Sequence, residues 1–154
     1  MQKITTFLTY NDQAEEAVRL YVSLFENSKI TKITHYPPGA PMPAGAVMKV
    51  AFKLAGQQYV ALNGGSYFSF AEGVSLSVAC ENQAEIDRLW DALTADGGQP
   101  GNCGWLKDRF GVSWQITPAN LGEILRDTTP EQSQRRMQAL MKMYKIDIAA
   151  LEQA

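Results

Sequence analysis

The chain has 154 residues, a formal net charge of −2 and an apolar fraction of 45%. This length predicts one domain, or two small modules that share a core. No apolar run approaches the roughly 20 residues of a membrane-spanning helix, and the cationic residues are scattered, so we expect no membrane segment and no nucleic-acid partner. The N-terminus has no apolar stretch of signal-peptide length, which favours a cytoplasmic location.

The first part of the chain predicts a strand, a helix and three further strands. Residues 4–10 alternate as a strand does, and the apolar residues of 14–21 have helical spacing. Asp12 and Glu15 have the spacing of a capping box for this helix. The three further strands are expected at residues 29–36, 47–54 and 57–63, with a proline-rich loop before the second.

The same order of elements recurs in the second part of the chain. Residues 74–80 alternate as a strand, and Asn82 and Glu85 repeat the cap spacing ahead of an apolar helical stripe. Gly97-Gly98 then supplies a helix stop, and a hairpin follows.

This recurrence predicts an internal duplication. Gln13-Ala14-Glu15 in the first half reappears as Gln83-Ala84-Glu85 in the second. We therefore interpret residues 1–154 as a single domain in which module 1 (about 1–65) and module 2 (about 74–118) are joined by a linker at about 66–73.

The hairpin that closes module 2 contains the first candidate site residue. Asp108-Arg109-Phe110-Gly111 has the composition of a short turn between two apolar arms. In the second arm one set of side chains is apolar and the alternate set is polar: Val112, Trp114 and Ile116 against Ser113, Gln115 and Thr117. A strand with one packed face and one polar face indicates a surface that borders a cavity, and Gln115 lies on its polar side.

Residues 119–154 predict a helical extension. Thr129-Pro130 with Gln132 is typical of a helix start. The helix carries one apolar stripe, formed by Met137, Leu140, Met141 and Tyr144. Such a stripe packs on its own domain or on a partner subunit, and we expect a homodimer.

The reactive residue types do not form a recognisable site. Cys80 and Cys103 are too far apart in sequence for a metal knuckle or a redox pair, and we interpret them as two buried thiols, with a disulfide as the alternative. His35 is the only histidine, which excludes a histidine cluster. Asp108 is a candidate general base, but its place in a turn favours bonds to backbone. The sequence therefore identifies no catalytic residue and leaves open whether the protein is an enzyme.

Several motifs are spread along the whole chain. They are Asn63-Gly64-Gly65, Trp90, Cys103-Gly104-Trp105-Leu106-Lys107-Asp108, Gly111-Val112-Ser113-Trp114-Gln115-Ile116, Met141-Lys142-Met143 and Asp147-Ile148-Ala149-Ala150-Leu151. Together they resemble the PhnB-like subgroup of the vicinal oxygen chelate superfamily, which includes glyoxalases, bleomycin-resistance proteins and extradiol dioxygenases. Some members of this subgroup carry the label 3-demethylubiquinone-9 3-methyltransferase.

The resemblance implies an α+β fold: two tandem βαβββ modules that form a curved mixed sheet around a shared cleft, followed here by C-terminal helices. It also implies dimers, and metal enzymes of the superfamily take ligands from the first and last strand of each module. Aligned with that pattern, the four ligand positions hold Thr5, either Ala61 or Asn63, Ser75 and Gln115. None of these offers an imidazole or a carboxylate, so we expect no bound metal and no cofactor.

The predicted function is that of a metal-free, homodimeric protein that binds a small organic molecule. The residues expected to bind it are Thr5, Phe7, Tyr59, Asn63, Ser75, Ser77, Trp105 and Gln115. Hydroxyls, amides and aromatic rings in one lining suit a neutral, partly aromatic ligand. The alternatives are an enzyme of the same fold that acts on a quinone-like aromatic, and an assembly module with an occluded cleft. Because the sequence lacks a glycine-rich loop after a strand, it does not predict an adenosyl-cofactor methyltransferase.

Overall fold

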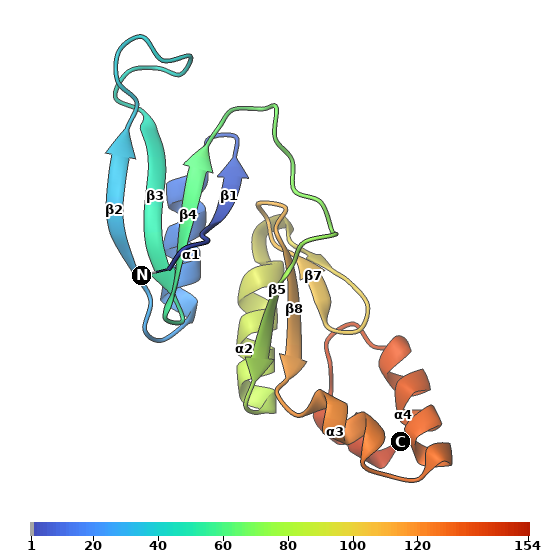
Figure 1. Ribbon diagram of the computed structural model, residues 1–154. Coiled ribbons are helices and arrows are strands. Elements are labelled where there is room, and N and C mark those ends of the chain that lie inside the picture. The colour runs from blue at the N-terminus through green and yellow to red at the C-terminus, as the bar shows by residue number, and fades with distance from the viewer. Residues whose placement is uncertain (1) are drawn as a thin grey trace. The chain divides into compact units, whose positions relative to one another are not determined.

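The first half of the chain folds into a sheet with one helix. The computed structural model describes residues 2–154, and contacts divide the chain into two compact units, Met1–Ser69 and Phe70–Ala154 (Figure 1). Unit 1 consists of β1 (Thr6–Tyr10), α1 (Ala14–Leu24), β2 (Lys29–His35), β3 (Val47–Leu54) and β4 (Gln57–Asn63). The strand order is β1-β4-β3-β2, in which β1 and β4 are parallel and the other pairs are antiparallel.

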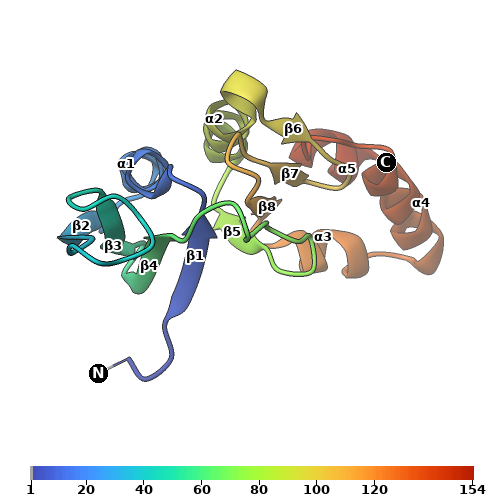
Figure 2. The same ribbon diagram turned by 90° about the horizontal axis from the view of Figure 1, so that it is seen from above.

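Helix α1 covers one face of this sheet, as Figure 2 shows from above. The helix contributes Ala14, Ala17, Val18 and Tyr21, all buried. The strands bury Leu8, Tyr10, Val50, Phe52 and Ala61. No helix of the described part of unit 1 covers the opposite face, which we call the open face of unit 1.

Unit 2 repeats the plan. Its elements are β5 (Leu76–Cys80), α2 (Gln83–Thr94), the 3₁₀ turn η1 (Ala95–Gly97), β6 (Gln99–Pro100), β7 (Trp105–Lys107) and β8 (Ser113–Pro118). The order β5-β8-β7-β6 again pairs the first and last strands in parallel. The prediction of an α+β fold with two tandem βαβββ modules is confirmed.

The two helices begin in different ways. Helix α2 starts as predicted, because the Asn82 side chain accepts a hydrogen bond from the Glu85 N–H at 2.9 Å. The capping box predicted at Asp12 is wrong: the N-cap of α1 is Gln13, whose side chain makes no capping bond. Instead Asn63 Oδ1, at the end of β4, accepts the Ala14 N–H at 2.8 Å.

Three short helices extend unit 2: α3 (Leu121–Arg126), α4 (Pro130–Met141) and α5 (Ile148–Gln153). Thr129 caps α4 through the Gln132 N–H, with Pro130 at the first turn, as predicted. The helices share a buried cluster made of Ile124, Leu140, Ile146 and Leu151.

The segment between α4 and α5 is bonded to the backbone just before β7. The N–H groups of Cys103 and Gly104 donate to the carbonyls of Met143 and Tyr144, both at 2.8 Å. A Cβ at Gly104, where φ is +85°, would approach the Ile116 carbonyl oxygen to 2.7 Å, so the close contact requires glycine. Across residues 2–154, none of the helices has the length and apolar character needed to cross a membrane.

Candidate functional site

The pairing of strands in unit 2 gathers four of the predicted site residues on one face. Gln115 of β8 lies beside Ser77 of β5 on one side and Trp105 of β7 on the other. Ser75, just before β5, contacts the same row through its hydroxyl. We call this face, opposite to the one that α2 covers, the open face of unit 2.

Gln115 is held in position within this row. Its Nε2 donates a hydrogen bond to Ser75 Oγ at 3.0 Å, which fixes the amide plane. No group within residues 2–154 bonds its Oε1, so the amide presents an acceptor together with a second N–H. Trp105 beside it is 37% exposed and offers the flat surface of an indole.

The turn before β8 explains why Gln115 faces this way. Asp108 is buried, and its Oδ1 accepts the N–H groups of Phe110 and Val112 at 2.9 and 3.0 Å. Its Oδ2 accepts Trp114 Nε1–H at 2.9 Å, which anchors that indole on the α2 side. Alternation then places Gln115 on the opposite side. The expectation that Asp108 bonds to backbone is confirmed, and the carboxylate also fixes a core tryptophan.

The structure does not bring the unit 1 candidates together. Phe7 pairs with Val60 on the open face of unit 1 and is 51% exposed, while Thr5 precedes β1. Tyr59 and Asn63 lie on the opposite face, toward α1. The expectation that Thr5 and Phe7 belong to one lining with Tyr59 and Asn63 is therefore wrong, because the register of β1 with β4 puts the two pairs on opposite sides of the sheet.

Tyr59 and Asn63 are both engaged within unit 1. The Tyr59 ring stacks on the buried Phe52 ring with 5.5 Å between centroids, and partial burial raises the pKa of the phenol. Asn63 is 6% exposed. Besides accepting from Ala14, it donates from Nδ2 to the Val47 carbonyl at 3.1 Å. Ligand contact by either side chain stays a prediction.

The register also settles which residue of module 1 corresponds to Gln115. The last pairs of the two parallel ladders are Tyr10 with Asn63 and Cys80 with Pro118. Counting back from these ends, Gln115 corresponds to Val60. The alternatives considered from sequence, Ala61 and Asn63, are both wrong, because each occupies the helix-covered side.

A hollow beside Trp105 adds residues that were not predicted from the sequence. It has a volume of about 300 Å³ and is lined by Glu72, Gln99, Pro100, Gly101, Trp105, Leu106, Lys107 and Ser113. The Lys107 ammonium contacts the Glu72 carboxylate, and this hydrogen bond lowers the pKa of Glu72. Lys107 stands two residues after Trp105 in the same strand, so alternation alone places it on the same face.

The two cysteines are free thiols, so the alternative of a disulfide is wrong. Burial raises the pKa of Cys80 to about 12, with the Glu85 carboxylate adding to the shift and Arg88 opposing it. The interpretation of both cysteines as buried thiols holds for Cys80 but not for Cys103, which is half-buried against the C-terminal helices, where its thiol donates to the Leu140 carbonyl at 3.5 Å. Among residues 2–154, His, Cys, Asp and Glu side chains form no group of three that could hold a metal ion.

Residues 2–117 match the model of a protein family described as 3-demethylubiquinone-9 3-methyltransferase. The chain belongs to this family. The match spans both βαβββ modules, and the C-terminal helices lie beyond it. The predicted membership of the PhnB-like subgroup is thereby confirmed.

Solved structures agree with this membership. A PhnB protein from Bacillus cereus, which carries the same methyltransferase label, is 39% identical, with a TM-score of 0.69 over 77% of this chain and 100% of that chain. Protein PA1353 from Pseudomonas aeruginosa is 22% identical, with a TM-score of 0.62 over 77% of this chain and 98% of that one. None of the curated proteins compared with the chain matches it.

A more distant likeness extends the fold to the superfamily. The fosfomycin resistance protein FosX from Listeria monocytogenes, in a structure complexed with Mn(II) and sulfate, is 13% identical, with a TM-score of 0.54 over 82% of this chain and 98% of that chain. This family member therefore has the fold of the vicinal oxygen chelate superfamily, as predicted.

Proposed function

We propose that the chain is a small-molecule-binding protein of the glyoxalase/bleomycin-resistance type, with its ligand on the open face of unit 2. The observation that carries this proposal is the row of Ser77, Gln115 and Trp105 across three paired strands. Ser75 orients the central amide and leaves Oε1 as an acceptor. The 300 Å³ hollow beside Trp105 lies in the lower range of small-molecule pockets.

The chemistry of this row favours an uncharged, partly aromatic ligand. The Gln115 amide can accept from a ligand N–H or O–H and donate to a ligand carbonyl. The exposed indole of Trp105 supplies stacking area. The cation in the hollow, Lys107, is already paired with Glu72, so it offers less to an anion.

Residues at the superfamily's metal positions do not fit a metal ion. With the register applied, these positions hold Thr5, Val60, Ser75 and Gln115, which supply neutral oxygens, one amide and a hydrocarbon. Divalent-cation sites in proteins nearly always include at least one imidazole, thiolate or carboxylate group. We therefore propose metal-free binding, in contrast to the Mn(II) complex of FosX.

A second candidate function is an enzyme of this fold acting on a quinone-like aromatic, which the family description favours. Such a substrate has carbonyls that the Gln115 amide could bind and a ring that Trp105 could stack on. A third is an assembly module with no ligand. Saturable binding of a small molecule would distinguish the binding protein and the enzyme from the assembly module. Conversion of that molecule to a product would distinguish the enzyme from the binding protein.

The test uses benzamide and acetophenone, two uncharged aromatic carbonyl compounds, as probes of the full chain. A ligand at a hundred times its dissociation constant stabilises the folded state by about 2.7 kcal/mol, which a thermal-shift assay detects. Gln115→Leu is expected to weaken binding by roughly 1 to 3 kcal/mol. Gln153→Leu makes the same change at an exposed position of α5 and is expected to change nothing. The proposal is wrong if neither probe binds, or if both variants bind alike.

We also propose a homodimer that acts in the cytoplasm. Leu140 turns into the core of unit 2, whereas Met137, Met141 and Tyr144 are 45%, 63% and 62% exposed. An exposed apolar stripe of this kind suits a subunit contact. Two free thiols suit a reducing compartment. Light scattering at low micromolar concentration should give twice the monomer mass, and Met137→Lys with Met141→Lys should give the monomer.

A further inference from the structure

The open face of unit 1 is strongly basic. Strands β1 to β4 contain no aspartate or glutamate. Four lysines of β2 and β3 share the face: Lys29, Lys32, Lys49 and Lys53. Their common side follows from the register, which pairs Lys29 with Lys53, Lys32 with Ala51 and Thr34 with Lys49.

The acidic groups of unit 1 lie elsewhere. Glu15 and Glu16 belong to α1, on the other side of the sheet, and Glu15 is paired with Arg19 of the same helix. Asp12 and Glu26 lie in the connections before and after that helix, outside the strands. No ion pair of Lys32 or Lys49 exists within residues 2–154. Like charges on adjacent strands repel, so this face carries an electrostatic cost that a bound anion would remove.

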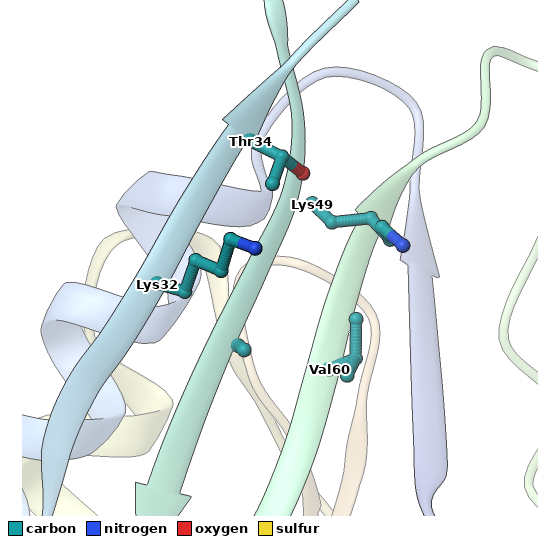
Figure 3. A pocket seen from close by; sticks show the side chains of 5 residues that line it. Lys32, Thr34, Lys49 and Val60 are labelled. Atoms are coloured by element: carbon teal, nitrogen blue, oxygen red, sulfur yellow. The ribbon is translucent and has the colours of Figure 1, made fainter.

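A hollow lies between two of these lysines. Its volume is about 120 Å³, and it is lined by Lys32, Thr34, Lys49, Ala51 and Val60. Figure 3 shows the side chains of Lys32 and Thr34 projecting from β2 over the sheet, with Lys49 and Val60 beside them. The floor is therefore apolar and the rim is cationic.

Thr34 adds a hydrogen-bonding group to this hollow. Its Oγ1 is buried and has no hydrogen-bond partner within residues 2–154. Buried hydroxyls are nearly always bonded, since an unbonded one loses its hydration without compensation. The hydroxyl can donate to an acceptor atom placed between Lys32 and Lys49.

We propose that this hollow binds the oxyanion group of a small molecule. An oxyanion would accept the Thr34 hydroxyl and neutralise the repulsion between two ammonium groups. Ala51 and Val60 would contact the carbon skeleton attached to it. A hollow of about 120 Å³ holds one acid group with a few carbon atoms rather than a nucleotide. The site shares no residue with the row around Gln115, so the two proposals stand or fall separately.

The test is an amide NMR titration of the full chain with sodium phosphate and, separately, sodium benzoate, at constant ionic strength balanced with chloride. Saturable shifts are expected for β2 and β3 residues around Thr34 and Lys49, with a millimolar dissociation constant. A stronger response to benzoate identifies a carboxylate ligand, and a stronger response to phosphate identifies a phosphate ester.

Three variants distinguish a specific anion-binding site from nonspecific electrostatic attraction of anions to the basic face. Lys49→Met is expected to weaken binding roughly tenfold, as loss of one charge-assisted bond requires. Thr34→Val, which keeps charge and shape, is expected to weaken it several-fold. Lys53→Met removes the same charge from the same strand and face but outside the hollow, and is expected to have less than about a twofold effect.

Two results would overturn the proposal. One is the lack of saturation by either anion up to about 100 mM, where even weak sites respond. The other is an equal loss of affinity in Lys49→Met and Lys53→Met with no effect of Thr34→Val, which would show that the face attracts anions only through its total charge. Gln115→Leu serves as a further control and should leave the anion titration unchanged.

Discussion

At equivalent places in the two sheets, unit 1 presents Phe7 beside Val60 and unit 2 presents Ser77 beside Gln115. The row of unit 1 continues through Ala51 to a lysine, whereas that of unit 2 continues to Trp105. The helix-covered sides are alike by contrast: Tyr10 and Cys80 are both buried beneath their helices, as are Ala61 and Ile116.

This difference separates what the fold requires from what function can use. Covering a sheet with a helix needs apolar side chains at every second position, and both modules supply them. The other set of positions makes no such demand. Unit 1 carries four lysines there, whereas unit 2 carries hydroxyls, amides and Trp105, with Lys107 paired to Glu72. Function on a duplicated fold is therefore sought on the faces that differ.

The largest effect on stability is expected at the β7–β8 turn, because the buried Asp108 carboxylate has no counterpart in the corresponding turn of unit 1. In unit 1, β3 and β4 are joined by Ala55-Gly56, whose positive φ angles of 48° and 86° make a two-residue turn, and its one side-chain bond runs from the Ala55 N–H to Ser28 Oγ at 2.9 Å. Asp108→Ala would strand two backbone N–H groups and Trp114 Nε1–H. We expect a loss of roughly 3 to 5 kcal/mol in the free energy of unfolding, measured by urea denaturation.

The control for this variant is Asp12→Ala, which removes an exposed carboxylate from the start of α1. It should change the free energy of unfolding by less than about 0.5 kcal/mol. Equal stability of the two variants would contradict the anchoring role of Asp108.

The next effect concerns the reactivity of the Cys80 thiol. Cys80 ends β5 at the position that Tyr10 has in β1. Since burial raises its pKa from 9.0 to about 12, the thiol stays protonated at pH 8 and should react with iodoacetamide at least about a hundredfold more slowly in the folded protein than in urea. Mass spectrometry of alkylated peptides measures this. The unfolded chain releases the proton above pH 9, so this group's contribution to stability is complete below pH 9 and is lost as the pH rises toward 12. In a Cys80→Ala variant, the free energy of unfolding should not show this loss between pH 9 and about 12.

An effect of intermediate size is expected at Asn63, whose amide has a structural role in unit 1, whereas the Gln115 amide of unit 2 is proposed to bind a ligand. Asn63→Ala leaves the Ala14 N–H and the Val47 carbonyl without partners, so we expect about 2 kcal/mol of destabilisation. Asn120→Ala, at a helix start where the side chain makes no capping bond, should cost far less. If Asn63→Ala kept full stability and weakened probe binding instead, the assignment of Asn63 to structure would be wrong.

The smallest effect is expected where only unit 2 carries additional helices. The Lys145–Asp87 ion pair, 2.9 Å long and well exposed, joins them to α2. Hydrogen bonds from Gln83 and then Lys145 lower the pKa of Asp87. Solvent screening limits the contribution of this ion pair to the free energy of unfolding to about 0.5 kcal/mol. Lys145→Ala should therefore change the stability very little, and even less at high salt concentration. Gln83→Ala should cost more, since its amide bonds both the Ile146 carbonyl and the Ile148 N–H.

The sequence was sufficient where a feature depends on residues close together. The turn at Asp108, the cap at Thr129 and the alternation around Gln115 are local patterns, and each was predicted. The cap of α1 was not, because its acceptor, Asn63, stands 49 residues from Ala14. The shared face of Tyr59 and Phe7 was predicted wrongly, because alternation within a strand does not tell which face its partner presents.

The basic face of unit 1 shows the same limit. Lys29 and Lys32 are three residues apart, so a regular strand would point them to opposite sides. A register shift between Ile30 and Lys32 turns Lys32 back to the side of Lys29. Nothing in the local sequence marks this irregularity, and the approach of Lys49 to Thr34 requires the pairing of two strands.

Whether a ligand binds the open face of unit 2 is tested most directly by an amide NMR map of the full chain titrated with benzamide. We expect saturable shifts concentrated at Ser75, Ser77, Trp105 and Gln115, which are lost in Gln115→Leu while the melting temperature of the free protein is unchanged. Shifts confined to unit 1, or a Gln115→Leu variant that binds normally but melts earlier, would show that the amide is structural and that the open face of unit 2 is not the binding site.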